Sequence, residues 1–335
     1  MRAATDLLSG PRIFFACIPI RNLHHEFGHP KSPRLPPGAP MTTLSRRAFL
    51  ASAAGPTAAA ILPSAPVLAA EPPRKFQLGL VTYNVPANWG LTTLLKVSKE
   101  VGIAAVECRT THKHGVEPTL TASQRQEVKK QFADSGVVFW GCGSVCEFHS
   151  ADPATVRKNI EECKRFVGLV KDLGGKGVKV RPNGVPKGSD PQKTFEQIGK
   201  ALVECGTAAA DAGIEIWVEV HGAVTQEPKN IRAIMDACGH PAVGVTWNSN
   251  GTDLDAKKSV AASYELLKPF IRSCHINDLE NDAKGTYPYR ELFRLFRAAG
   301  YDRYTMCEVG KSYDVEAGTK FLKGYKVLWE KLADG

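Results

Sequence analysis

IEIWVEVH, which spans residues 214–221, is the stretch that decides the fold. Side chains on a β-strand alternate between its two faces. One face of this strand is aliphatic throughout, and its residues are Ile214, Ile216, Val218 and Val220. The other face includes Trp217, Glu219 and His221, so polar side chains gather toward the carboxyl end. This pattern predicts a strand that packs one face against helices and turns the other into an interior.

Seven further segments have a comparable strand pattern, and longer amphipathic patterns alternate with them. The predicted strands are residues 77–83, 103–109, 137–143, 177–181, 214–220, 243–248, 271–277 and 304–309. The predicted helices are residues 90–101, 121–134, 152–172, 190–211, 228–238, 254–270, 287–299 and 315–332. Several helices are followed by glycine, a common C-terminal cap, namely Gly102, Gly136, Gly174, Gly213, Gly239 and Gly300. Eight strand–helix units in about 255 residues predict a single-domain α/β fold, the (β/α)8 or TIM barrel.

A doubly wound open sheet is the alternative architecture for alternating strands and helices. Its nucleotide-binding form carries a glycine-rich turn after the first strand. This chain instead has Asn84-Val85-Pro86-Ala87 at that place, which is not a phosphate-binding sequence. The barrel is therefore the favoured prediction.

Polar residues occupy the interior phase of other strands as well, again near the carboxyl end. They are Glu107 and Arg109, Lys179 and Arg181, Asn248, His275, and Glu308. Active sites of (β/α)8 barrels are built at this end. Burying Glu, Asn, His and Glu together without a ligand would be costly, and their oxygen and nitrogen donors suit a divalent cation. The pattern therefore predicts a functional site there.

The charge of the chain is unevenly distributed. The formal net charge is +9, and residues 1–70 contribute seven Arg or Lys against two Asp or Glu. The remaining residues therefore carry 36 basic and 32 acidic side chains, a net charge of +4. Nucleic-acid-binding proteins need a concentrated basic surface, so a small dispersed excess argues against that class. The nine cysteines are scattered without a CxxC motif, which favours buried free thiols over a disulfide framework.

The segment 41–70 is predicted to be an export signal. Ser45-Arg46-Arg47-Ala48-Phe49-Leu50 resembles the twin-arginine signal, and an Ala-rich apolar stretch and small residues follow it. Prolines interrupt the apolar stretch, so no stable membrane span is expected. The resemblance implies processing near Ala70, the twin-arginine export machinery as a partner, and a periplasmic location.

The remaining boundaries follow from that signal. Residues 1–40 are rich in proline and have no periodic apolar face. Because twin-arginine signals normally begin near the start of a chain, we interpret residues 1–40 as a mistaken upstream extension or a disordered segment, with Met41 as the start. Residues 71–335 are then the mature barrel domain, for which a homo-oligomer is possible.

Five short motifs in the strand order resemble the xylose-isomerase-like barrel superfamily, often described as sugar phosphate isomerases/epimerases. The motifs are Val106–Arg109 (VECR), Val218–His221 (VEVH), Val243–Asn248 (VGVTWN), Cys274–Asp278 (CHIND) and Cys307–Gly310 (CEVG). Each motif is weak alone, but the five in this order on successive strands are specific for the superfamily, and the resemblance covers roughly residues 76–332. The resemblance implies the barrel fold and says little about the substrate.

The resemblance also implies one divalent metal ion, Mn²⁺, Mg²⁺ or Zn²⁺. In the epimerase branch, Glu, Asp, His and Glu on strands five to eight hold the ion, and they correspond here to Glu219, Asn248, His275 and Glu308. Asn248 departs from the pattern, because it offers an oxygen but no charge. Metal affinity is therefore expected to be lower, unless a neighbour such as Asp253 compensates.

The same resemblance implies roles for the other polar residues. Glu219 and Glu308 correspond to the two carboxylates that remove a proton beside a carbonyl and return it on the other face of the sugar. The remaining candidates are substrate-binding: Glu107, Arg109, Lys179, Arg181, His221 and Asp278. Asp278 is alternatively an orienting partner of His275.

A metal-dependent isomerase or epimerase acting on a sugar is the leading functional hypothesis. Export argues against a phosphorylated substrate and favours a free sugar or keto-sugar. A lyase or hydrolase of 3-keto-glycosides would need the same proton abstraction, and a non-catalytic sugar-binding barrel remains a second alternative because of Asn248. A DNA-repair endonuclease of the same barrel type needs more metal ligands than this sequence offers.

Overall fold

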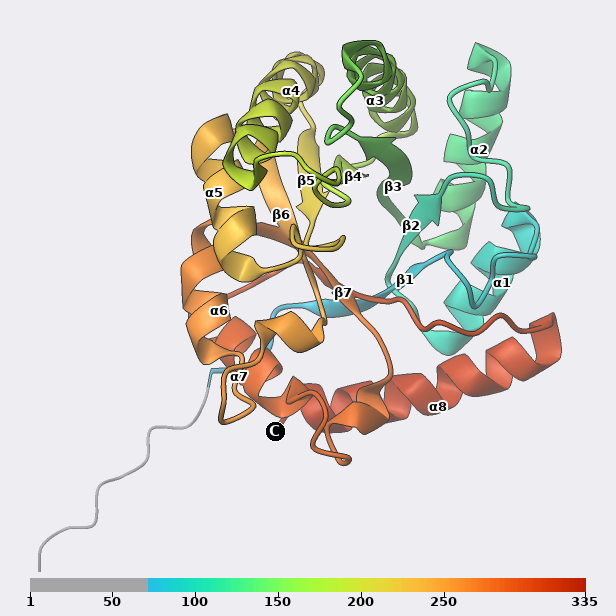
Figure 1. The fold of residues 1–335 in the computed structure, drawn as a ribbon. Coiled ribbons are helices and arrows are strands. Elements are labelled where there is room, and N and C mark those ends of the chain that lie inside the picture. The colour runs from blue at the N-terminus through green and yellow to red at the C-terminus, as the bar shows by residue number, and fades with distance from the viewer. Residues whose placement is uncertain (1–71) are drawn as a thin grey trace, which may run out of the picture. The chain divides into compact units, whose positions relative to one another are not determined.

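The computed structural model describes residues 72–335, and their strands form one closed parallel barrel (Figure 1). The strands are β1 (Gln77–Val81), β2 (Ala105–Arg109), β3 (Val138–Glu147), β4 (Gly177–Arg181), β5 (Glu215–Glu219), β6 (Val243–Asn248), β7 (Ile271–Ile276) and β8 (Tyr304–Cys307). Each strand pairs with the next, and β8 pairs with β1. The predicted (β/α)8 barrel is confirmed. The predicted export signal and the segment before it lie outside the described residues.

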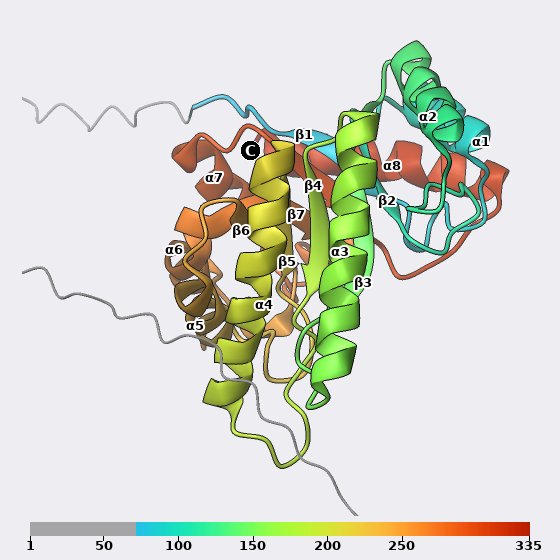
Figure 2. The ribbon, with the colours of Figure 1, turned by 90° about the horizontal axis from the view of Figure 1, so that it is seen from above.

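Helices alternate with the strands and pack around the outside of the barrel (Figures 1 and 2). They are α1 (Leu91–Val101), α2 (Ala122–Ser135), α3 (Pro153–Leu173), α4 (Pro191–Ala212), α5 (Pro228–Cys238), α6 (Ala261–Leu267), α7 (Tyr289–Ala299) and α8 (Val315–Ala333). No helix among residues 72–335 is both long and apolar enough to cross a membrane.

The helix ends follow the sequence signals. Side chains of Thr121, Asp152, Asp190 and Asp314 accept hydrogen bonds from the first backbone N–H groups of α2, α3, α4 and α8, which otherwise lack partners. All six glycines predicted to follow helices adopt the left-handed conformation at the C-cap. The glycine caps end these six helices at the loops that lead into the following strands.

Most predicted boundaries agree with the structure to within two residues, and two elements differ by more. A single helix over 254–270 is wrong, because only Ala261–Leu267 is α-helical. The preceding segment is a turn in which the Ser259 N–H donates to the Asp255 carboxylate at 2.9 Å and Lys258 has φ of 60°, a conformation that no α-helix accommodates. Strand β3 in turn continues past the predicted end at residue 143 to Glu147.

The barrel interior is layered. A buried apolar layer is formed by Val81, Ala105, Trp140, Trp217 and Met306. The indoles of the two tryptophans stack with ring centroids 4.9 Å apart. Space for them comes from Gly177, where a Cβ would lie 2.4 Å from the Trp217 ring. The layer separates a polar cluster at the carboxyl ends of the strands from an ion-pair cluster at their amino ends.

The ion-pair cluster at the amino ends is centred on Glu215. Its carboxylate accepts hydrogen bonds from the Arg303 guanidinium at 2.6 and 3.0 Å, from the Arg272 guanidinium at 3.3 Å and from the Trp217 indole N–H at 2.8 Å. Lys176 lies 3.6 Å from the same carboxylate. One acidic side chain at this end of the barrel is therefore shared by three cations.

Candidate active site

Three predicted ligands converge at the carboxyl ends of β5, β7 and β8. The Nδ1 atom of His275 lies 3.0 Å from Oε2 of Glu308 and 3.8 Å from Oε1 of Glu219. One ligand atom from each of these residues lies within 4.8 Å of the others. His275 and Glu219 are buried, and Glu308 is mostly buried. The period-two pattern thus led to residues that meet in space.

The other ring nitrogen of His275 has a separate partner. Nε2 lies 3.1 Å from Oε2 of Glu107 on β2, and neither side chain is exposed to solvent. A carboxylate behind a histidine fixes the orientation of its ring, and this arrangement is common behind metal-binding histidines. Glu107, which the sequence suggested for substrate binding, therefore orients His275 in this structure.

Asp278 does not take the orienting role that the sequence allowed for it. Its carboxylate accepts the Glu280 N–H at 3.1 Å and caps the short 3-10 helix η3 (Leu279–Asn281). The side chain is about half exposed, and Lys284 lies 3.5 Å from it. Glu107 occupies the position at His275 instead, so this alternative is corrected.

Glu219 is the most heavily contacted carboxylate of the cluster. Its Oε2 accepts a hydrogen bond from the Lys179 ammonium at 2.6 Å, and its Oε1 accepts one from the Asn248 amide at 3.3 Å. Burial raises the pKa of Glu219, but the charges of Lys179 and His275 outweigh burial and hold that pKa well below its usual range. Glu219 is therefore ionised, as a base or a ligand must be.

The two buried cations of the cluster are held in their charged forms. Burial lowers the pKa of Lys179, yet Glu219, Glu308 and Glu107 outweigh it and raise that pKa. Burial also opposes the charged form of His275, and the surrounding carboxylates again outweigh it and raise the pKa of the imidazole. The cluster thus balances three carboxylates with a lysine and a histidine.

The remaining predicted substrate-binding residues lie around the rim. Arg109 is partly buried, and its guanidinium lies 5.4 Å from the centre of the Tyr83 ring. Arg181 pairs with Glu147 at the end of β3. The Nδ1 atom of His221 lies 3.0 Å from Oδ1 of Asn183, which leaves its Nε2 without a partner in the interactions described.

Sequence reasoning missed Glu147, Asn183 and Tyr83 at this rim. Glu147 was missed because β3 was ended too early; the register pairs it with Arg181. Asn183 has a left-handed backbone with φ of 59° in the loop after β4, a conformation for which Asn is enriched. A loop residue carries no periodic signal, so only its type hinted at a special role.

Asp253 is not part of the cluster, so the expectation that it compensates for Asn248 is wrong. Its Oδ2 accepts hydrogen bonds from the Tyr287 hydroxyl and the Asn250 N–H, both at 2.8 Å. Tyr287 in turn accepts the indole N–H of Trp247, which packs on the helix-facing side of β6. Burial raises the pKa of Asp253 to about 7.

The cluster offers a donor set that suits a divalent cation. Glu219, Glu308 and His275 supply two carboxylates and an imidazole, and the Asn248 side chain lies beside Glu219. Such mixed oxygen and nitrogen sets bind Mn²⁺, Mg²⁺ or Zn²⁺ and do not by themselves choose between them. Nδ1 of His275 faces the carboxylates while Glu107 holds Nε2, which is the orientation that a ligand histidine needs.

A family model for the xylose isomerase-like TIM barrel matches residues 95–327. The chain belongs to this family. The match spans all eight helices except the first residues of α1 and the end of α8, and it includes every residue of the cluster. A search of curated protein sequences finds no match.

Solved structures of several sugar epimerases have the same fold. A D-psicose 3-epimerase solved with D-fructose superposes with a TM-score of 0.66 at 14% identity, covering 78% of this chain and 100% of its own. The 3-keto-D-glucoside 4-epimerase from E. coli gives 0.63 at 15% identity, covering 76% and 99%. An L-ribulose 3-epimerase gives 0.62 at 14% identity, covering 77% and 94%. At these sequence identities, the likenesses establish the fold.

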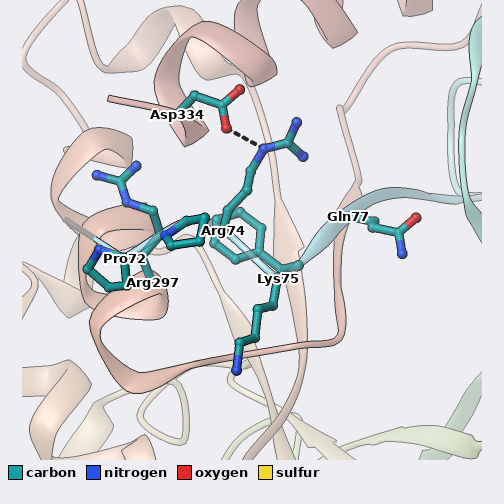
Figure 3. Close-up of a pocket in the computed structure, with 8 residues that line it drawn as sticks. Pro72, Arg74, Lys75, Gln77, Arg297 and Asp334 are labelled. Carbon is teal, nitrogen blue, oxygen red and sulfur yellow. Dashed lines mark hydrogen bonds and ion pairs between the residues drawn. The ribbon is translucent and has the colours of Figure 1, made fainter. Parts of the chain in front are cut away.

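A hollow lies at the other end of the barrel, before β1. Pro72, Arg74, Lys75, Gln77, Arg297 and Asp334 line it (Figure 3). Arg74 pairs with Asp334 and lies 4.4 Å above the Trp329 ring, and Arg297 donates to the Ala333 carbonyl. These contacts attach the segment before β1 to the end of α8. The hollow has a structural explanation and lies away from the polar cluster.

Proposed function

We propose that this protein is a metal-dependent isomerase or epimerase of a non-phosphorylated sugar or keto-sugar. The observation that carries the proposal is the convergence of the Glu219 and Glu308 carboxylates on Nδ1 of His275, at 3.8 and 3.0 Å, at the carboxyl end of the barrel. Both carboxylates are largely buried beside a cationic side chain, a combination typical of functional sites. The printed names of the structural neighbours, psicose, ribulose and 3-keto-glucoside epimerases, agree with such chemistry.

The mechanism assigns each glutamate one proton transfer. One carboxylate removes the proton from the carbon beside the sugar carbonyl, and the electron pair moves onto the carbonyl oxygen. For epimerisation, the other carboxyl group, which enters the step in its protonated form, donates that proton to the opposite face of the same carbon, and the electron pair returns from the oxygen to re-form the carbonyl. For isomerisation, the proton is added to the former carbonyl carbon, and the proton of the neighbouring hydroxyl passes to the former carbonyl oxygen as the new carbonyl forms. A bound divalent cation would supply the charge that polarises the carbonyl and stabilises the oxygen anion.

The rim residues would position the sugar for this transfer. Arg109 and Arg181 are cationic donors for hydroxyl or carbonyl oxygens, and His221 is held by Asn183 with its Nε2 available. Glu107 keeps the His275 ring in place from behind. Holding the reacting carbon between two fixed carboxylates is worth more than any single contact to the sugar.

Incubating the protein with Mn²⁺ and a panel of free ketoses and 3-keto-glucosides in D₂O tests the proposal. NMR should show deuterium entering the carbon beside the carbonyl, together with a new epimer or isomer. Release of the aglycone from a keto-glycoside would instead identify an elimination, the alternative lyase reaction, which shares the first proton transfer. Absence of both deuterium exchange and product across the panel would contradict the enzyme proposal and favour a sugar-binding barrel.

Export by the twin-arginine route is part of the same proposal, because it places the protein where free sugars occur. Changing Arg46 and Arg47 together to Lys should abolish export and leave a cytoplasmic precursor. Cell fractionation followed by immunoblotting measures the outcome. Normal appearance of the processed form outside the cytoplasm would show that another pathway is used.

Asn248→Asp is expected to tighten Mn²⁺ binding. The Asn248 amide lies 3.3 Å from Glu219, so a carboxylate there adds a charge next to the proposed ligands. In the metal-free protein the same carboxylate would repel Glu219, and the melting temperature should fall. Calorimetric titration with Mn²⁺ measures the affinity, and Asn88→Asp on the exposed β1–α1 loop is the charge-matched control. Equal affinity in Asn248→Asp and in the wild type would remove Asn248 from the metal site.

A further inference from the structure

Lys179 is a buried ammonium group placed inside the proposed metal site. It projects from β4 into the barrel, is 4% exposed, and its Nζ lies 2.6 Å from Oε2 of Glu219. Glu219 is its single hydrogen-bond partner among the contacts described for residues 72–335. The side chain thus occupies one of the two oxygens that Glu219 has to offer a cation.

The two oxygens of Glu219 face different partners. Oε2 is held by Lys179, whereas Oε1 faces His275 Nδ1 at 3.8 Å and the Asn248 amide at 3.3 Å. A divalent ion placed among Glu219, His275 and Glu308 would therefore meet Oε1 alone, with the ammonium on the far oxygen of the same carboxylate. Two cations that share one buried carboxylate repel each other, and bulk salt screens buried charges poorly.

Asn248 also makes the proposed ion position less negative than an aspartate there would. An aspartate at this position would add one negative charge, and the lysine adds one positive charge, so the cluster is two charge units less negative than a carboxylate-rich site without Lys179. Glu107 does not restore the balance, since it lies behind His275 and contacts Nε2. The carboxylates of Glu219 and Glu308 and the ammonium of Lys179 thus leave one net negative charge around the ion position before any ion binds.

We propose, on the basis of the function proposed above, that Lys179 is the residue that sets the cation affinity of this site: it limits Glu219 to one ligand oxygen and opposes the incoming ion. The competing explanation is that Lys179 only compensates the buried charge of Glu219. That structural role predicts lower stability when the lysine is removed, but no gain in cation affinity. The two explanations therefore separate on a binding measurement that does not depend on turnover.

The experiment titrates Mn²⁺ into the metal-stripped protein by calorimetry, with the paramagnetic resonance signal of free Mn²⁺ as a second readout. Lys179→Met is expected to bind Mn²⁺ at least about tenfold more tightly than the wild type, because the ammonium is gone and both Glu219 oxygens become available. Lys179→Gln, which keeps a neutral donor for Glu219, should fall between the two. Lys176→Met is the matched control, because it removes the same charge at the opposite end of the barrel, where Lys176 lies 3.6 Å from Glu215.

Each outcome has a definite reading. If the wild type binds Mn²⁺ and both Lys179 variants bind it with equal or lower affinity, the proposed role of Lys179 is overturned, whereas the metal site itself is supported. Failure of the wild type and all variants to bind Mn²⁺ at millimolar concentration overturns the metal site itself, and with it this inference. If Lys179→Met does not fold, the Mn²⁺-induced rise in melting temperature is compared between Lys179→Gln and the wild type. A rise in Lys179→Gln that is no larger than in the wild type overturns the proposal.

Discussion

Glu219→Gln and Glu308→Gln are each expected to lower turnover by about 10²–10⁴-fold, the usual contribution of a general acid or base. Glutamine keeps the shape of the side chain and one oxygen, but it cannot take up a proton. In Glu219→Gln that oxygen still accepts from Lys179, so the buried ammonium keeps a partner. Both variants should therefore fold and retain some Mn²⁺ binding, and the loss should appear in kcat.

Deuterium exchange distinguishes the two-carboxylate mechanism from a general loss of binding. The wild type should wash solvent deuterium into the carbon beside the carbonyl, and the double variant should not. If one single variant still exchanges deuterium but forms no product, the glutamate that remains in that variant performs the first proton transfer. Glu204→Gln, an exposed change on α4 where Glu204 pairs with Arg157, is the control for the loss of a carboxylate. Near-normal turnover in either single variant would eliminate the mechanism.

The sequence predicted the barrel because its signals are local and repeat eight times. Alternation within a strand sets which side chains face inward, and the C-terminal glycines mark the helix ends. Glu219, His275 and Glu308 could be placed in one pocket on that basis, because the carboxyl ends of parallel barrel strands meet at one rim. The sequence could therefore predict the parts of the site that depend only on alternation along each strand.

The partners inside the site were not accessible in the same way. Period-two alternation put Glu107 and Lys179 in the interior, but it gave no distance across the barrel. Only the structure shows that Glu107 reaches His275 from β2, and that Lys179 reaches Glu219 and not an open substrate position. The predicted end of β3 and the predicted helix before α6 were wrong for another reason. Pairing with β4 extends β3 to Glu147, and the hydrogen bond from the Ser259 N–H to Asp255 forms a turn where the apolar pattern predicted a helix.

Glu215 illustrates this limit most sharply, and it carries the largest expected effect on stability. It shares a strand face with Glu219, so alternation alone cannot tell an active-site glutamate from a structural one. Their positions along the strand distinguish the two glutamates. Glu215 lies at the amino end of β5 and Glu219 at its carboxyl end, with Trp217 between them. Its partners Arg303 and Arg272 come from the approach to β8 and from β7, far away in the sequence.

Glu215→Ala is expected to lower the free energy of unfolding by about 3–5 kcal/mol, the range for removing one partner of a buried ion pair. The change leaves Arg303 and Arg272 facing each other without their shared carboxylate and removes the acceptor of the Trp217 N–H. Urea unfolding at pH 7 measures the loss. Glu196→Gln on the exposed face of α4 is the control and should stay within about 0.5 kcal/mol of the wild type.

The pH dependence gives an independent check on the same carboxylate. Burial raises the pKa of Glu215, but Arg303, Trp217 and Arg272 outweigh it and lower the pKa to about 2. A carboxyl group whose pKa is depressed by folding stabilises the native state above its unfolded value of about 4.5, and this contribution is lost as the pH falls toward 2. The wild type should therefore lose stability between about pH 5 and pH 2, and Glu215→Ala should lose less over the same interval. Parallel curves for the two proteins would show that the cluster at the amino ends contributes no net electrostatic stabilisation, and that Glu215 serves only to fill space beneath Trp217.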